Sequence, residues 1–138
     1  MVEKQLNILL VEDDQVDVMN VRRAFERNRI TNPLHVATDG VEALETLRNG
    51  KLPRDRRLVL LDLNMPRMNG IEFLREVRRD PELQSTPVVV LTTSNDDRDK
   101  VDAYNLNVAG YLLKPVTFSN FCEVMAALNR YWALVELP

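Results

Sequence analysis

Side chains that can carry charge or donate protons recur directly after short apolar runs in this chain. Glu12 and Asp13 follow one run, Asp62 a second, Thr92 a third and Lys114 a fourth. If these runs are strands of one parallel sheet, their carboxyl ends lie along a single edge, where functional groups gather in such sheets. We therefore expect three carboxylates, a hydroxyl and an ammonium group to converge there.

A cluster of carboxylates of this kind requires a cation. Two carboxylates about 4 Å apart repel each other by roughly 1–4 kcal/mol, depending on the effective dielectric constant. Lys114 would offset part of this repulsion, and a hard divalent ion such as Mg²⁺, with Mn²⁺ as an alternative, would offset the rest. A metal, a carboxylate and a lysine together suit phosphoryl transfer, because both cations neutralise charge on the transferred group. The accepting oxygen would belong to a carboxylate, and Thr92 could donate a hydrogen bond to the product.

The elements that must position these residues follow from the hydrophobic pattern. Five short runs with almost no polar residues are typical of strands covered on both faces in a parallel sheet. They span residues 6–11, 34–37, 58–61, 88–91 and 110–113. The segments between and after them have apolar residues at helical spacing, and we place the end of the last helix near Arg130. The alternation predicts an α/β fold, a doubly wound five-stranded parallel sheet with helices on both faces.

Length and composition narrow the possible classes of protein. A chain of 138 residues has the size of one domain, so we expect a single domain over 1–138, with 131–138 as an apolar C-terminal extension. The net charge of −3 gives no general attraction to nucleic acid or to an anionic membrane. Cys122 has no second cysteine with which to pair, which favours a reducing cytoplasmic setting. We find no signal peptide and no apolar stretch of the roughly 20 residues needed to span a bilayer.

Four motifs resemble, in their order and spacing, the receiver domains of two-component response regulators. They span residues 10–13, 60–70, 90–92 and 110–115. The resemblance covers nearly the whole chain and implies a flavodoxin-like (βα)5 fold with strand order 2-1-3-4-5. Three features resemble, more narrowly, the small stand-alone regulators paired with bacterial and cyanobacterial phytochromes. They are the third helix, the loop at 54–57 and the tail at 131–138.

The resemblance implies a phosphoacceptor and a set of metal ligands. Asp62 is expected to accept the phosphoryl group. Asp13 and Asp62 would bind Mg²⁺ directly, together with the backbone carbonyl of Asn64, and Glu12 would hold a coordinating water. At position 12 many relatives have aspartate, and glutamate keeps the charge.

The resemblance also implies residues that stabilise and sense the phosphoryl group. Lys114 would pair with the acceptor and then with the phosphoryl oxygens, aimed by a cis peptide bond to Pro115. Thr92 would move to meet a phosphoryl oxygen, and Tyr111 would rotate into the space vacated. Thr93 is bulkier than the residue that relatives often have there, so we expect it to restrict water and slow dephosphorylation.

The expected partner is a sensor histidine kinase, of the phytochrome type in the narrower resemblance. Because only a short tail follows the last helix, we expect output through protein association rather than through DNA binding. A homodimer would use the fourth helix, the fifth strand and the fifth helix, where the switch should act.

Three other functions are alternatives to phosphoryl acceptance by a receiver. A phosphatase with an aspartyl-phosphate intermediate needs a second acid two residues after the nucleophile, where this chain has Asn64, so we expect no enzyme turnover. A flavodoxin-like nucleotide site needs a phosphate-binding loop after the first strand, where Glu12, Asp13 and Asp14 would repel phosphate. A non-phosphorylated interaction module would have no need for the complete set of site residues.

Overall fold

The five apolar runs form one parallel sheet in the order β2-β1-β3-β4-β5 in a computed structural model, which describes residues 6–135. The strands are β1 (Asn7–Val11), β2 (Leu34–Ala37), β3 (Arg57–Leu61), β4 (Val88–Thr92) and β5 (Gly110–Leu113). The helices are α1 (Gln15–Arg27), α2 (Gly40–Arg48), α3 (Gly70–Arg79), α4 (Asp97–Asn105) and α5 (Phe118–Leu134). The predicted fold class and strand order are confirmed.

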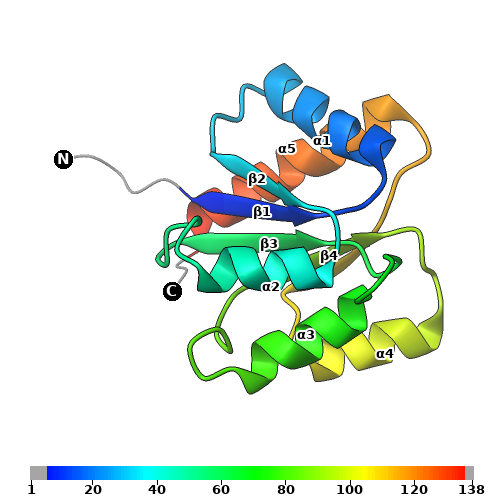
Figure 1. Ribbon diagram of the computed structural model, residues 1–138. Helices are drawn as coiled ribbons and strands as arrows, with labels where there is room; N and C mark the ends of the chain where they lie inside the picture. The colour runs from blue at the N-terminus through cyan, green and yellow to red at the C-terminus, as the bar shows by residue number, and fades with distance from the viewer. Residues whose placement is uncertain (1–5, 136–138) are drawn as a thin grey trace.

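Helices cover both faces of the sheet, so the molecule has three layers (Figure 1). Helices α1 and α5 lie on one face, and α2, α3 and α4 lie on the other. Side chains alternate across each strand, so that in β1 Ile8 and Leu10 enter the core under α1 and α5, while Leu9 and Val11 enter the core under α2 and α3. Burial on both faces explains why the strands lack polar residues.

Strand register brings the functional residues to one edge of the sheet. Val11 pairs with Leu61 across β1 and β3, and Thr92 pairs with Leu113 across β4 and β5. The residues that follow these pairs therefore leave the sheet at the same carboxyl edge. Strands β1 and β3 supply the acids, and the next two strands along the sheet, β4 and β5, supply the hydroxyl and the amine.

Helix α5 is longer than the sequence pattern suggested. The predicted end near Arg130 is wrong, because the helix continues to Leu134. The extension is held by Trp132, which is 3% exposed and packs edge-on against Phe25 of α1 with ring centroids 6.4 Å apart. The part of the predicted tail at 136–138 lies outside the described residues.

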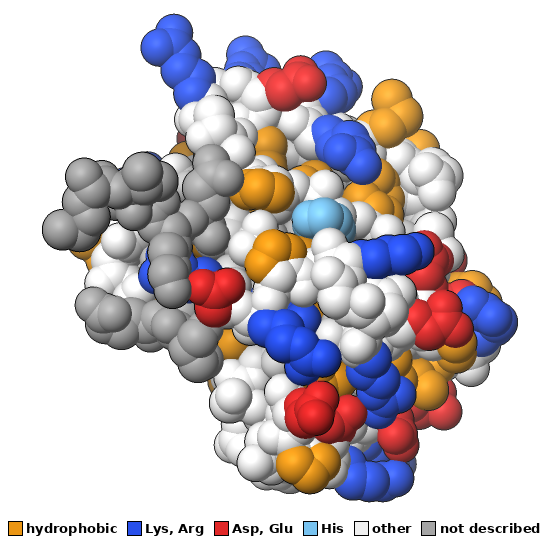
Figure 2. Space-filling model, turned by 60° about the vertical axis from the view of Figure 1, so that its left-hand side comes forward, with side chains coloured by type: hydrophobic (Ala, Val, Ile, Leu, Met, Phe, Trp, Pro, Cys, Tyr) orange, Lys and Arg blue, Asp and Glu red, His pale blue; other side chains and the backbone are white. Residues whose placement is uncertain are grey.

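The outer surface mixes both signs of charge. On the face shown in Figure 2, basic and acidic side chains lie interspersed among small apolar areas. His35, in the edge strand β2, is half-buried and reaches this surface. None of the helices in the described residues is both long and apolar enough to cross a membrane.

Candidate functional site

The predicted acids do come together at the carboxyl edge of the sheet. Glu12, Asp13 and Asp62 each offer a carboxylate oxygen, and these oxygens lie within 4.8 Å of one another. Glu12 and Asp62 are buried, whereas Asp13 is exposed and opens the cluster to solvent. The backbone N–H of Asn64 donates to Asp62 Oδ1 over 3.3 Å, which places the fourth predicted ligand residue beside Asp62.

Lys114 reaches this cluster from the end of β5. Its ammonium group donates to Glu12 Oε1, to Asp17 Oδ2 over 2.7 Å and to Asp62 Oδ2 over 3.4 Å. Its side chain is only 7% exposed. Burial by itself would lower the pKa of Lys114, but the hydrogen bonds to Asp17 and Glu12 outweigh it and raise the pKa above its usual value. Lys114 is therefore charged at any physiological pH.

Glu12 lies in surroundings that disfavour its charged form. Burial raises the pKa of Glu12 to about 8, the charge of Asp62 adds to this effect, and the hydrogen bond from Lys114 opposes it. The single ammonium of Lys114 is shared among the carboxyl groups of Glu12, Asp17 and Asp62. Several carboxylate oxygens, one of them from an exposed residue, form a donor set that fits a hard divalent cation such as Mg²⁺.

Thr92 links the Asp62 carboxylate to the loop that follows β4. The side chain is fully buried, and its hydroxyl donates to Asp62 Oδ1 over 2.8 Å. The Ser94 N–H donates to Thr92 Oγ1 over 3.3 Å, and the Tyr111 hydroxyl donates to the Ser94 carbonyl over 2.8 Å. Burial raises the pKa of Tyr111, so its hydroxyl stays protonated as a donor. The two predicted switch residues are therefore joined through Ser94.

The predicted cis peptide bond between Lys114 and Pro115 is wrong, because no peptide bond between described residues is cis. A trans bond suffices to aim the lysine. The Lys114 N–H donates to the Thr92 carbonyl over 2.8 Å, which extends the pairing of β4 and β5 by one residue. The sheet itself therefore directs the side chain toward Glu12 and Asp62.

Gly70 has a packing role that the sequence pattern did not reveal. It opens α3 directly beneath the acceptor loop, where a Cβ atom would lie 2.6 Å from the carbonyl oxygen of Asp62 and 2.7 Å from the Cα of Leu63. Only a residue without a side chain lets α3 approach Asp62 this closely. The signal in the sequence was a glycine directly after the helix cap Asn69.

Two acidic residues near the site were also missed as functional candidates. Asp17 stands three residues after the cap Asp14, a spacing typical of a capping box, yet its carboxylate contacts Lys114. Asp39 caps α2 by accepting from the Glu42 N–H and pairs with Arg67 over 2.6 Å. Sequence spacing does not reveal either ion pair, because the partners lie 97 and 28 residues apart.

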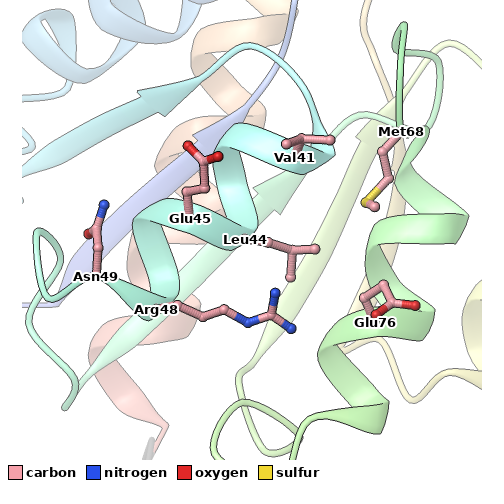
Figure 3. A pocket seen from close by; sticks show the side chains of 7 residues that line it. All are labelled: Val41, Leu44, Glu45, Arg48, Asn49, Met68 and Glu76. Atoms are coloured by element: carbon pink, nitrogen blue, oxygen red, sulfur yellow. The ribbon is translucent and has the colours of Figure 1, made fainter.

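A surface cavity in the described part of the chain lies away from this cluster. It has a volume of about 660 Å³ and lies between α2 and α3 (Figure 3). It is lined by Val41, Leu44, Glu45, Arg48, Asn49, Met68 and Glu76. None of the predicted site residues lines it, so it is separate from the carboxylate cluster.

Comparison with known proteins identifies the family. Residues 8–126 match the family model of the response regulator receiver domain. The chain belongs to this family. The receiver is 41% identical to a protein of Methanothrix harundinacea described as a probable methanogenesis regulatory protein, FilR2, over 91% of this chain and 82% of that protein. It is 36% identical to the response regulator Rcp1 of Synechocystis sp., over 95% of this chain and 92% of Rcp1.

Solved structures agree with this assignment. The receiver resembles the phosphorylated cyanobacterial phytochrome response regulator RcpA with a TM-score of 0.87 and 33% identity, over 98% of this chain and 99% of that one. The Mn²⁺-bound form of Rcp1 gives a TM-score of 0.84 and 35% identity, over 96% and 99% of the two chains. These likenesses extend through the whole described fold.

Proposed function

We propose that this receiver accepts a phosphoryl group on Asp62 from a phosphohistidine of a sensor histidine kinase. One observation carries the proposal: the buried Asp62 carboxylate is contacted by both the Thr92 hydroxyl and the Lys114 ammonium. A carboxylate oxygen attacks phosphorus, the N–P bond breaks, and its electron pair returns to the imidazole of the kinase. The product is an aspartyl phosphate whose new oxygens require hydrogen-bond donors.

A divalent cation, Mg²⁺ or Mn²⁺, completes the proposed site. Asp13 and Asp62 would hold it directly with the backbone carbonyl of Asn64, and Glu12 would hold a bound water. Support comes from the clustered oxygens and from the Mn²⁺-bound structure of the relative Rcp1. When bound, the ion supplies positive charge that neutralises the phosphoryl oxygens.

The residues of the chain itself stabilise and report the product. The Lys114 ammonium would pair with one phosphoryl oxygen, and the Thr92 hydroxyl would turn from Asp62 to another. Because Ser94 joins Thr92 to Tyr111, movement of Thr92 would be passed to the Tyr111 ring on β5. The expected result is a change in the surface formed by α4, β5 and α5.

We propose that this chemistry stores a signal and does not turn over phosphate esters. The phosphorylated state would form once per signal and decay by slow hydrolysis. Asn64 stands where a phosphatase of this type would need an acid to protonate the leaving group. The receiver is therefore proposed to act in the cytoplasm as a phosphorelay component and not as an enzyme.

A phytochrome-type sensor kinase is the proposed partner. The support comes from the relatives Rcp1 and RcpA, of which RcpA is described as a phytochrome response regulator. Output is proposed to pass through protein association, with a homodimer on the α4–β5–α5 face, and not through nucleic acid or a membrane. Exposed apolar side chains on this face support a protein contact, namely Val101, Tyr104, Leu113 and Val116.

The test of phosphoryl acceptance is incubation with acetyl phosphate and Mg²⁺ followed by intact mass spectrometry. We expect one added phosphoryl group on the unaltered receiver and none on Asp62→Asn. Asp97→Asn removes an acid that is 99% exposed and should be labelled like the unaltered protein. Equal labelling of Asp62→Asn would show that another residue is the acceptor.

A further inference from the structure

Asp17 brings an additional carboxylate to Lys114, although it lies outside the sequence motifs that resemble the family. The distance from Lys114 Nζ to Asp17 Oδ2 is 2.7 Å, whereas the distance to Asp62 Oδ2 is 3.4 Å. The Asp17 side chain is 25% exposed, and that of Lys114 is 7% exposed, so the pair is mostly shielded from water. The ammonium group is therefore closer to Asp17 than to the proposed acceptor.

The start of α1 leaves the Asp17 side chain free for this contact. An acid at the third helical position commonly reaches back to the N–H of the capping residue. Glu72 does so in α3, where it forms a capping box with Asn69. In α1 the N–H of the cap Asp14 donates instead to Glu12 Oε2, and the carboxylate of Asp17 turns to Lys114.

The same arrangement ties α1 firmly to the site. The Asp14 side chain accepts from the N–H groups of Val16 and Asp17, so the backbone of Asp17 is fixed by the cap. The Asp17 backbone is therefore held by the Asp14 side chain, and the Asp17 carboxylate is bonded to Lys114. Because the backbone of Asp17 is fixed, its carboxylate can hold the Lys114 ammonium in one position.

We propose that Asp17 is a positioning residue that holds the Lys114 ammonium back from Asp62 until Asp62 is phosphorylated. This role rests on the proposed phosphoryl acceptance at Asp62. To contact a phosphoryl oxygen, the ammonium must move toward Asp62 and lengthen its bond to Asp17. Loss of that charge-assisted bond opposes the phosphorylated state. Asp17 thus favours the unphosphorylated receiver, and the strength of this preference depends on its negative charge.

The first test compares Asp17→Asn with the matched control Asp14→Asn. Both variants remove one negative charge from the same end of α1, and asparagine caps a helix as well as aspartate. At limiting acetyl phosphate and saturating Mg²⁺, we expect Asp17→Asn to need about fivefold less acetyl phosphate for half phosphorylation, the effect of losing one charge-assisted bond. Asp14→Asn should stay within about twofold of the unaltered protein on the same scale. Asp17→Glu restores the charge and should return the value toward that of the unaltered receiver.

The second test needs neither metal nor phosphoryl donor. In the metal-free receiver, the NMR signal of the Lys114 Cε–Hε group should shift more on Asp17→Asn than on Asp14→Asn. A shift no larger than that of Asp14→Asn would overturn the contact itself. Phosphorylation of Asp17→Asn equal to or weaker than that of Asp14→Asn would overturn the restraining role. If the unaltered receiver takes up no phosphoryl group, phosphoryl acceptance and the restraint both fall, and the NMR result separately decides whether Asp17 positions Lys114.

Discussion

At the scale of single residues, Asp62 is distinguished as the proposed acceptor by its neighbours. Asp62 accepts from the Thr92 hydroxyl on one oxygen and faces Lys114 with the other. A strand-end aspartate without these neighbours would be an ordinary loop acid. Thr92 and Lys114 come from separate strands, so the chemistry proposed for Asp62 depends on how the sheet brings these strand ends together.

Thr93 gives the first prediction at this scale. It directly follows Thr92, whose buried hydroxyl contacts Asp62, and it is itself exposed. Replacing it with alanine removes bulk there, so Thr93→Ala should lose its phosphoryl group several-fold faster than the unaltered receiver. Decay of the phosphorylated form after removal of acetyl phosphate measures this rate. An unchanged half-life would show that Thr93 does not obstruct water.

Asp39 gives a prediction about acid stability. Burial by itself would raise its pKa, but the Glu42 N–H and the Arg67 guanidinium lower it below the usual 3.8. A group with a lowered folded-state pKa contributes stability above its unfolded pKa and loses that contribution as the pH falls through the folded value. The stability of the receiver should therefore drop on acidification below about pH 4, and Asp39→Asn should weaken that dependence. Urea unfolding at pH 5, 4 and 3 measures it. A pH dependence in Asp39→Asn as steep as that of the unaltered receiver would contradict the assignment.

At the scale of elements, a buried arginine fixes the edge of the sheet opposite the site. Arg57 begins β3 and is 5% exposed, and its guanidinium donates to the carbonyl groups of Leu47, Leu52 and Pro53. These carbonyls belong to the end of α2 and the loop after it. Burial and the nearby charge of Arg54 lower the pKa of Arg57. The residue therefore serves as a clamp between α2 and β3.

Loss of this clamp should be costly. Arg57→Met would leave buried carbonyl groups without donors, and we expect the free energy of unfolding to fall by about 2–4 kcal/mol. Arg54→Met removes a neighbouring arginine whose side chain is 57% exposed and pairs with Glu82 at the surface, so it should cost less than about 1 kcal/mol. Urea denaturation compares the two, and equal losses would contradict the clamp.

At the scale of the whole molecule, the exposed apolar residues lie on different sides of the fold. Val101 and Tyr104 of α4 are more than half exposed, and Val116, just after β5, is fully exposed. On the other side of the sheet, Met19 of α1 is 58% exposed. Charged substitutions on these surfaces can distinguish which one carries self-association.

The proposed homodimer is tested by light scattering with and without a beryllofluoride phosphoryl mimic. If the α4–β5–α5 face forms the interface, Tyr104→Arg should shift the receiver toward monomer by burying an unpaired charge there. Met19→Arg places the same charge on α1 and should leave the dimer unchanged. A monomer at high concentration, with and without the mimic, would refute self-association.

Much of the fold and of the site could be predicted from the sequence. Apolar runs identify buried strands because both faces of a parallel sheet exclude water, and the strand-end rule then brings Glu12, Asp13, Asp62, Thr92 and Lys114 together. These inferences need only residue type and order. The structure places all five as expected.

Only the tertiary structure decided which hydrogen bonds and ion pairs these side chains form. The Lys114 ammonium lies 2.7 Å from Asp17 Oδ2 and 3.4 Å from Asp62 Oδ2, and these three residues come from separate parts of the fold. The last turn of α5 likewise depends on burial of Trp132 against α1, which joins residues more than 100 positions apart. Local sequence does not contain these distances, because they are set by the close packing of elements that lie far apart along the chain.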